Sequence, residues 1–255
     1  MITIKNKLAL AKMKRAGQAL AEIFEEIQPL LRPGLSTLEI DGDIAKRLAQ
    51  KGLTSRTKGY MGYKHVSCIS VNDEVVHGVP SKDTLLVSGD VVKIDICASW
   101  KGYCGDMART FFIVQSTPES KKLAEVAQSA LDKGIEMARV GNRLTDISAA
   151  IQVEVERHGF GVVRDFAGHG IGKQLHEDPE ILNYGKPGKG PVLRAGMTFA
   201  IEPMITQGAY DVYITEDGWT VKTKDKSLAA HVEDTIAITD QGPRILTRLQ
   251  KEGGK

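Results

Sequence analysis

The segment LVSGDVVKID at residues 86–95 has a counterpart 107 positions later, LRAGMTFAIE at residues 193–202. One offset aligns identical or similar residues, pairing Leu86 with Leu193, Gly89 with Gly196, and Asp95 with Glu202. Long internal periods indicate that a supersecondary unit is repeated. The two segments therefore predict a chain built from two related halves, each of which contributes an acid at an equivalent position.

The same offset extends upstream, through a pair of expected helices. It matches Gly34 with Gly141, Glu39 with Asp146, Ile40 with Ile147, and Gly52 with Gly159. An offset that holds over two helices and over a later strand is harder to obtain by chance than one or two matches. We therefore expect a single domain, residues 1–255, with half-repeats at roughly 6–115 and 116–245 whose strands share one central sheet.

Apolar spacing and capping signals place the main elements. Helices are expected at residues 6–31, 36–52, 117–138 and 144–158. The second of these begins with the capping box Ser36-Thr37-Leu38-Glu39, and the third with a capping threonine followed by Pro118. Strands are expected at residues 66–71, 91–96 and 106–114, and the last hundred residues return to strands and loops.

The composition is typical of a soluble globular domain, with 42% apolar and 26% charged residues. A net charge of +2 favours neither nucleic acid nor a membrane as the main partner. No apolar run approaches the roughly 20 residues that span a bilayer, and the N-terminus lacks the apolar core of a signal peptide. Three cysteines are too few for a disulfide framework, so we expect free thiols and a cytoplasmic protein.

Two histidines, His169 and His176, lie among glycines in the segment FAGHGIGKQLHEDPEILNY at residues 166–184. Seven residues equal two helical turns, but each glycine costs a helix about 1 kcal/mol relative to alanine. We therefore expect His169 at a loop or strand end, aimed at a ligand. Taken alone, the segment fits a pair of structural histidines in a surface loop equally well.

Two acids, Asp95 and Asp106, flank a bend at residues 100–102. With an even loop, residues whose numbers sum to 201 or 203 pair, and both acids lie on one face. The sum of 201 would place them directly opposite, about 5 Å apart at Cβ. Their apolar neighbours predict burial, and two buried carboxylates need a proton or a cation. An odd loop would separate them.

Two further acids lie in apolar strand patterns. Glu202 precedes Pro203, which holds it extended, and Glu233 lies in the run at residues 231–238. Together with His169 and the first two acids, they form a reasonable set of ligands for divalent Mn, Fe, Co or Zn, among which ligand type does not choose. Two carboxylate-bridged ions would suit hydrolysis, because they lower the pKa of a bridging water and polarise a scissile carbonyl.

These residues resemble those of the type I methionine aminopeptidases of the bacterial kind. The segments shared with that family are, in order, VVHGVP, VKIDI, YCGDMARTF, FAGHGIGKQLHEDPEILNY, FAIEPMI and HVEDTIAIT, and they cover nearly the whole length. The resemblance implies an α+β architecture known as the pita-bread fold, with two pseudo-symmetric αβ halves around a central curved antiparallel sheet. It also implies removal of the N-terminal methionine from nascent proteins and peptides whose second residue is small and uncharged.

The resemblance further implies a role for each candidate residue. Two divalent ions per chain (Co, Mn, Fe or Zn) would be held by Asp95, Asp106, His169, Glu202 and Glu233. Of these, Asp106 and Glu233 would bridge the ions. The catalytic residues would be His77, His176 and Glu202, with both histidines contacting substrate as well. The methionine pocket would be lined by Tyr60, Tyr63, Cys68 and Trp219.

Some members of the family carry Phe in place of Leu175 and His in place of Met61, which bears on fine specificity. One rival function is that of an Xaa-Pro aminopeptidase or dipeptidase on the same fold, although those enzymes usually carry an extra N-terminal domain. A second rival is a binding module, although such proteins have typically lost ligands. The expected partner is the N-terminus of a peptide or nascent chain, and the expected oligomeric state is a monomer. A transient contact with the ribosome is a further candidate interaction.

Overall fold

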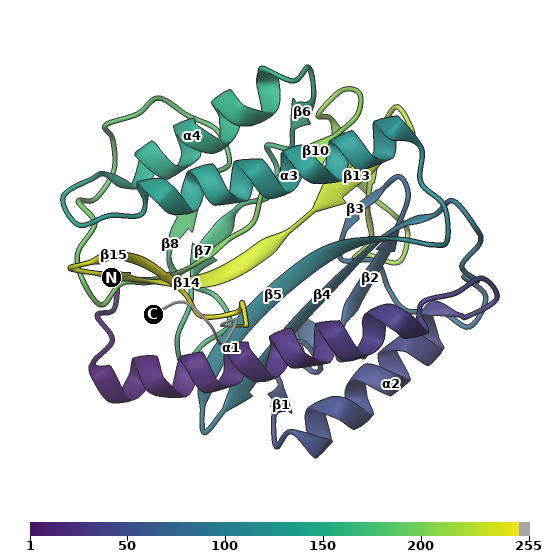
Figure 1. Cartoon of the computed structure of the whole chain (residues 1–255), viewed down its shortest axis with the longest axis horizontal. Coiled ribbons are helices and arrows are strands. Elements are labelled where there is room, and N and C mark those ends of the chain that lie inside the picture. Colours follow the sequence, from purple (N-terminus) through teal and green to yellow (C-terminus); the bar gives the residue numbers. More distant parts are fainter. Residues whose placement is uncertain (250–255) are drawn as a thin grey trace.

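The structure is a computed structural model of the chain, and it describes residues 1–249. Residues 250–255, the end of the expected domain, lie outside the described residues. Figure 1 shows two pairs of helices lying along one face of a strongly twisted sheet, with the helices of each half of the sequence paired together. This is the arrangement of two αβ halves around a curved antiparallel sheet that the sequence predicted.

Four helices occupy the positions expected from the sequence. They are α1 (Lys7–Ile27), α2 (Thr37–Gln50), α3 (Pro118–Met137) and α4 (Leu144–Glu156), and a 3-10 turn, η1 (Gln28–Leu30), follows α1. The predicted capping box is present at α2, where the Ser36 hydroxyl accepts a hydrogen bond from Glu39 N and the Glu39 carboxylate accepts one from Ser36 N. The Thr117 hydroxyl likewise caps α3 by accepting from Ser120 N.

The strands form one large antiparallel sheet and two small ones. The large sheet has the strand order β1 (Thr54–Ser55), β4 (Val91–Trp100), β5 (Tyr103–Phe112), β14 (Glu233–Thr239), β9 (Thr198–Ile201), β7 (Gly168–Gly170), β8 (Glu177–Ile181). Two further strands pair beside this path: β2 (Cys68–Val71) pairs with β4, and β15 (Gly242–Ile245) pairs with β14. The small sheets are β13 (Ala229–His231), β10 (Met204–Thr206), β6 (Gly161–Val162) and β11 (Val212–Ile214), β12 (Val221–Thr223), β3 (Glu74–Val76). A short 3-10 turn, η2 (Tyr60–Gly62), lies between β1 and β2.

The 107-residue offset reappears in the backbone hydrogen bonds. Gly34 N donates to Leu86 O at 2.8 Å, and the matching Gly141 N donates to Leu193 O at 3.1 Å. Isolated bridges join Ser36 to Leu85 and Arg143 to Val192, again 107 positions apart. Each helix pair is therefore tied by the same bonds to the segment that leads into its strand, β4 in one half and β9 in the other.

The β4–β5 hairpin settles which register the first two acids adopt. Asp95 pairs with Ala108, and Cys97 pairs with Asp106, so the paired numbers sum to 203. The two acids thus share a face but lie diagonally, not directly opposite each other. The loop has only two residues, Lys101 and Gly102, both with positive φ, as tight hairpins require. Because the loop is so short, both strands run closer to the turn than the sequence predicted.

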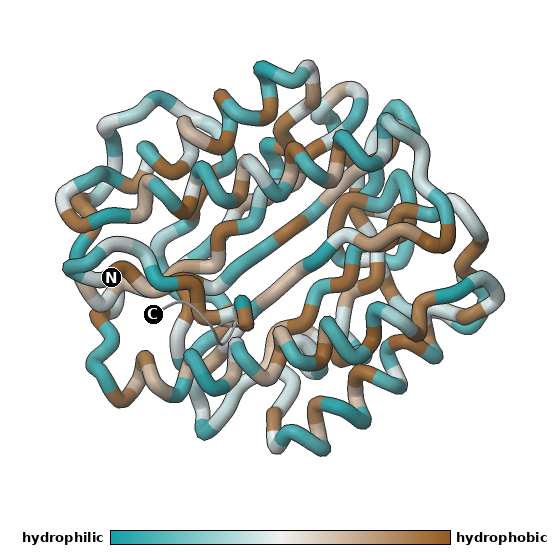
Figure 2. The backbone as a smooth tube through the Cα atoms, in the orientation of Figure 1, coloured by the Kyte–Doolittle hydropathy of each residue, from teal (hydrophilic) through white to brown (hydrophobic). Residues whose placement is uncertain are grey.

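The apolar core lies between the helices and the sheet, in one cluster for each half of the chain. In the tube of Figure 2, hydrophobic residues recur along each helix between hydrophilic ones. Along α1, residues from Ala16 to Ile27 are buried in the cluster of the first half, and Leu31 packs at the edge of that cluster. Burial of each Leu or Ile side chain contributes about 1.5–3 kcal/mol, so these two clusters set the position of the sheet between them.

Glycine lets α1 approach the sheet closely beside one of the acids. A Cβ added at Gly105 would lie 2.9 Å from Gly17 N, which belongs to α1. Gly105 directly precedes Asp106 on β5, so this contact fixes the backbone next to that carboxylate. Within residues 1–249, no helix has both the length and the apolar character needed to cross a membrane.

Candidate metal centre

Five candidate ligands stand on five neighbouring strands of the large sheet. Asp95 lies on β4, Asp106 on β5, Glu233 on β14, Glu202 directly after β9, and His169 on β7. These strands are consecutive in the sheet order β4-β5-β14-β9-β7. The side chains therefore gather across the centre of the sheet although 138 positions separate the first from the last in sequence, from 95 to 233.

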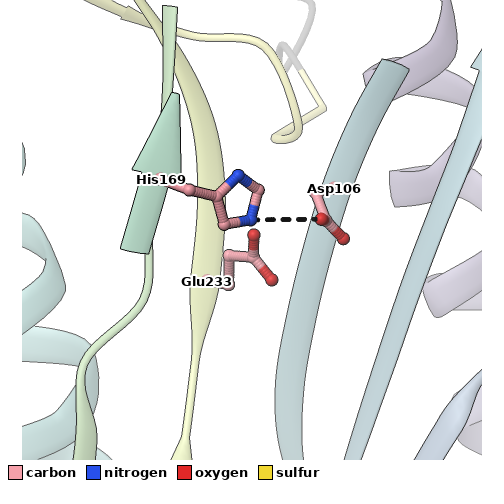
Figure 3. A group of neighbouring side chains, drawn as sticks. All are labelled: Asp106, His169 and Glu233. Carbon is pink, nitrogen blue, oxygen red and sulfur yellow. Dashed lines mark ion pairs between the residues drawn. The ribbon is translucent and has the colours of Figure 1, made fainter. Parts of the chain in front are cut away.

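The side chains converge on a small volume. The ligand atoms of Asp106, His169 and Glu233 all lie within 4.8 Å of one another. Figure 3 shows His169 extending from β7 towards Asp106 on β5, with the Glu233 carboxylate between them. His169 Nε2 is 3.7 Å from Asp106 Oδ2 and 3.5 Å from Glu202 Oε1. These separations suit atoms that share a cation.

Loss of water dominates the electrostatics of the four carboxyls. Burial raises the pKa of Asp106 to about 8 and the pKa of Glu202 to about 8. Burial, followed by the charge of Asp106, raises the pKa of Asp95 and the pKa of Glu233 well above their usual range. Four such carboxyls cannot all ionise side by side without positive charge among them.

Unpartnered atoms show that these residues fit a metal. Asp106 Oδ1 and Glu233 Oε1 are buried and have no hydrogen-bond partner. An unsatisfied buried polar atom costs about 1–3 kcal/mol, and more when the group is charged. A divalent cation among these oxygens would remove that cost and neutralise the carboxylates. Oxygen donors with one imidazole are ligands that Mn, Fe, Co and Zn accept.

The imidazole of His169 is prepared as a neutral ligand. Its Nδ1 lies 2.9 Å from Gly170 O, so Nδ1 carries the proton and donates it to that carbonyl. The lone pair then resides on Nε2, the atom that faces the acids. Burial, reinforced by the neighbouring His176, lowers the pKa of His169 to about 3. Donation from Nδ1–H to a backbone carbonyl fixes the tautomer that a metal ligand needs.

Two further histidines, His77 and His176, line the same cavity as the acids. The His176 ring centroid is 4.4 Å from that of His169, and His176 Nδ1 is 2.7 Å from the Tyr60 hydroxyl. His77 has a φ of 60° and packs edge-on against Phe166. Burial lowers the pKa of His77 to about 4 and also lowers the pKa of His176, so both rings are neutral.

A cavity of about 110 Å³ joins these groups to an aromatic pocket. It is lined by every candidate residue from the sequence, namely Tyr60, Tyr63, Cys68, His77, Asp95, Asp106, His169, His176, Glu202, Trp219 and Glu233. The rings of Tyr63 and Trp219 meet edge-on with centroids 4.9 Å apart. Of the two positions noted for specificity, Leu175 lines the cavity, whereas Met61 is 81% exposed and is not among the lining residues.

The family model for metallopeptidase family M24 matches residues 11–240 of the chain. The chain belongs to metallopeptidase family M24. It is 47% identical to a methionine aminopeptidase of Clostridium acetobutylicum, over 97% of this chain and 99% of that protein. Its structure superposes on the crystal structure of a methionine aminopeptidase from Thermotoga maritima with a TM-score of 0.96 and 44% identity, covering 98% of this chain and all of that one.

A more distant match concerns the rival function. An Xaa-Pro dipeptidase from Bacillus anthracis is 25% identical, with a TM-score of 0.78, and this chain covers only 63% of it. This chain thus shares the fold of that dipeptidase, but its sequence is far less similar to the dipeptidase than to the two methionine aminopeptidases. Membership of the family confirms the pita-bread fold, a hydrolase activity and the use of divalent metal.

Sequence reasoning missed two residues of this M24 centre. His231 is 1% exposed, with Nε2 3.3 Å from Glu202 Oε2, and the ligand atoms of Glu202, His231 and Glu233 lie within 4.8 Å of one another. Cys97 lines the cavity as well. Both could have been found from strand alternation, because residues two apart on a strand share a face. His231 is two before Glu233, and Cys97 is two after Asp95.

Proposed function

We propose that this chain is a methionine aminopeptidase, which removes the N-terminal methionine from nascent proteins and peptides when the second residue is small and uncharged. One observation carries the proposal: a single cavity contains both the acid and histidine set and the aromatic pocket. The two methionine aminopeptidases named above match this chain from end to end, which supports the same substrate.

We propose that two divalent ions bind at the centre. Asp106 and Glu233 would bridge them, Asp95 would hold one, and His169 with Glu202 would hold the other. When bound, the ions would supply Lewis-acid activation of water and of the scissile carbonyl. The orphaned oxygens of Asp106 and Glu233 and the neutral Nε2 of His169 support this assignment.

The residues around the ions would move and hold protons. Glu202 would take a proton from the attacking water and return it to the leaving amine, as a general base and then acid. His176 would donate Nε2–H to the carbonyl oxygen of the first residue if Tyr60 donates to its Nδ1. His77, which lines the same cavity, would also contact the substrate.

The pocket would select the methionine side chain. Tyr60, Tyr63, Cys68 and Trp219 surround an apolar space that a flexible thioether can fill. Contacts between sulfur and aromatic rings contribute about 0.3–1.5 kcal/mol. A bounded pocket distinguishes side chains by about 1–3 kcal/mol for each methylene, so shorter residues would bind less well.

Peptide assays test this function directly. The purified protein should release methionine from Met-Ala-Ser with added Co(II) or Mn(II), should lose that activity with a chelator, and should leave an Xaa-Pro peptide intact. Cleavage of the Xaa-Pro peptide instead would favour the rival peptidase, and no turnover of either peptide with metal bound would favour a binding module. Elemental analysis of protein purified without added metal decides among Co, Mn, Fe and Zn.

The remaining expectations concern the protein in the cell. We propose that it acts as a single catalytic domain and as a monomer, in the cytoplasm, on the N-termini of emerging chains. We also propose a transient contact with the ribosome. Sedimentation of the purified protein and its fractionation with ribosomes are the measurements that check these points.

A further inference from the structure

A third imidazole reaches the metal centre from outside the five-residue set. His231 ends β13, and Glu233, two residues later, begins β14. Its side chain is almost completely buried, and its Nε2 has no hydrogen-bond partner among the described residues. A buried ring nitrogen left in that state costs about 1–3 kcal/mol. We therefore expect this nitrogen to gain a hydrogen-bond partner when the centre binds metal.

One carboxylate oxygen near this nitrogen belongs to Glu202. The two carboxylate oxygens of Glu202 face different histidines: Oε1 is 3.5 Å from His169 Nε2, and Oε2 is 3.3 Å from His231 Nε2. His169 Nε2 carries a lone pair, because the ring proton is on Nδ1, which donates a hydrogen bond to Gly170 O. Oε1 and His169 Nε2 could therefore both bind one cation, whereas Oε2 lies beside His231 Nε2.

The ring of His231 is held by its backbone. The Thr110 hydroxyl on β5 donates to His231 O at 2.8 Å and accepts from His231 N at 3.3 Å. On the other side, His231 pairs with Met204 of β10. The main chain is fixed from both sides and the residue is 1% exposed, so the imidazole has little room to leave Glu202, which is the property that a residue orienting another side chain requires.

We infer that His231 is a positioning residue, whose Nε2–H donates a hydrogen bond to Glu202 Oε2 and so holds Oε1 towards the ion position shared with His169. This inference rests on the proposed metal centre. Partners of this kind orient metal ligands, and their loss typically costs 10–100-fold in metal affinity or activity. The role differs from that of a ligand, because any residue with a well-placed N–H can fulfil it.

Paired substitutions test the donor. His231→Gln keeps an N–H donor, whereas His231→Met keeps similar bulk without one. We expect Co(II) affinity, measured by calorimetry, to stay within about threefold of wild type in H231Q and to fall 10–100-fold in H231M. The Co(II) d–d absorption spectrum should keep the intensity of wild type in both, since no ligand is lost. For Met-Ala-Ser, kcat should fall in H231M with little change in KM.

A matched control and a measurement on the wild type complete the test. His158→Met changes a half-buried histidine that lies next to Glu154 on α4, and it should leave Co(II) affinity unchanged. If H231M does not fold, 15N NMR of the Zn(II)-loaded wild type still reports the ring: Nε2 of His231 should carry a proton. A metal-bound Nε2 there would make His231 a ligand and overturn the inference.

The outcomes separate the possibilities. Equal losses in H231Q and H231M, with an altered d–d spectrum, would likewise identify a ligand. Wild-type affinity and turnover in H231M would show that the ring is only packing. If Co(II) affinity follows the expected order but the wild type releases no methionine, then the positioning role stands and the proposed substrate fails.

Discussion

At the scale of single residues, burial raises the pKa values of the acids in the centre, and this has a measurable effect on metal binding. At pH 7, Asp106 and Glu202, each with a pKa of about 8, retain most of their protons in the metal-free protein. A metal ion needs both as carboxylates, so binding must expel those protons.

We therefore predict proton release on metal binding near neutral pH. Because the pKa values of all four carboxyls are raised, the release should be large from the ordinary carboxyl range up to about pH 8, and it should decline at higher pH as these groups ionise before the metal binds. Calorimetry of Co(II) binding in buffers of different ionisation enthalpy measures the number released. Equal heats in all buffers at pH 7 would contradict the prediction.

The second prediction concerns Asp106. In Asp106→Asn, one buried carboxylate becomes a neutral amide of the same shape, so a bridging ligand and its charge are lost. We expect metal binding and methionine release to be abolished, as followed by calorimetry and peptide assay. Asp83→Asn, at an exposed position, is the control and should behave as wild type. Near-normal turnover of the D106N variant would rule out the bridging role.

The third prediction concerns Tyr60, whose hydroxyl lies 2.7 Å from His176 Nδ1. Tyr60→Phe keeps the ring in the pocket but removes the bond that orients the imidazole. Loss of one hydrogen bond is worth about 0.5–1.5 kcal/mol, so we expect kcat to fall by up to about tenfold with metal content unchanged. Tyr213→Phe, at an exposed position, is the control. A lower metal content in Y60F would point to a structural effect instead.

At the scale of elements, the contact between α1 and β5 carries the fourth prediction. In Gly105→Ala, the new Cβ would lie 2.9 Å from Gly17 N, so helix and strand must separate. Overpacking of this kind costs about 1–3 kcal/mol, measurable by urea unfolding. Gly42→Ala in α2 is the control, since nothing lies within 4 Å of its added Cβ, and it should be neutral or stabilising. Equal stability of both variants would contradict the close contact.

The elements also show where sequence reasoning stopped. Local chemistry identified the helices, because caps and apolar spacing act within a few residues. For the β4–β5 hairpin, an even loop left two registers, in which the numbers of paired residues sum to 201 or 203. The register with the sum of 203 follows from the two-residue loop, which only the structure shows. The face that His231 occupies was readable from alternation, yet its approach to Glu202 depends on how β13 and β9 are placed in space.

At the scale of the whole molecule, the seam between the two halves runs through β5 and β14, and an ionic cluster holds it. Asp234, fully buried, accepts from Arg109 of β5 at 2.7 Å and from Arg248 at 2.7 Å. Arg109 also donates to Glu233 O at 2.6 Å, so the cluster joins the strands that carry both proposed bridging acids.

The fifth prediction follows from that cluster. Asp234→Asn removes the counter-charge that Arg109 pairs with and leaves Arg248 paired with Asp132 alone. Breaking a fully buried pair costs about 3–5 kcal/mol. Because Arg248 is 35% exposed, water offsets part of this, and we expect about 2 kcal/mol by urea unfolding. Asp83→Asn breaks a fully solvated pair with Lys82 and should change stability little. A loss no larger than in that control would mean that the cluster does not hold the seam.

The repeat predicted this architecture but not all of its symmetry. Asp95 and Glu202 keep the offset of 107, whereas Asp106 and Glu233 are 127 positions apart. The first half turns from β4 to β5 in two residues, while the second half inserts β10 to β13 between β9 and β14. No local pattern announces such an excursion, because its strands are stabilised by partners from other parts of the chain, such as β3 and β6.

The placement of one candidate ligand on each of five consecutive strands has a consequence for how the chain reaches its final form. A strand that slips by one residue turns all its side chains to the opposite face. On β14, such a slip would present Val232 or Asp234 where Glu233 should stand. Two cations that together need all five donors would then bind only correctly aligned sheets, and so would stabilise aligned molecules at the expense of misaligned ones.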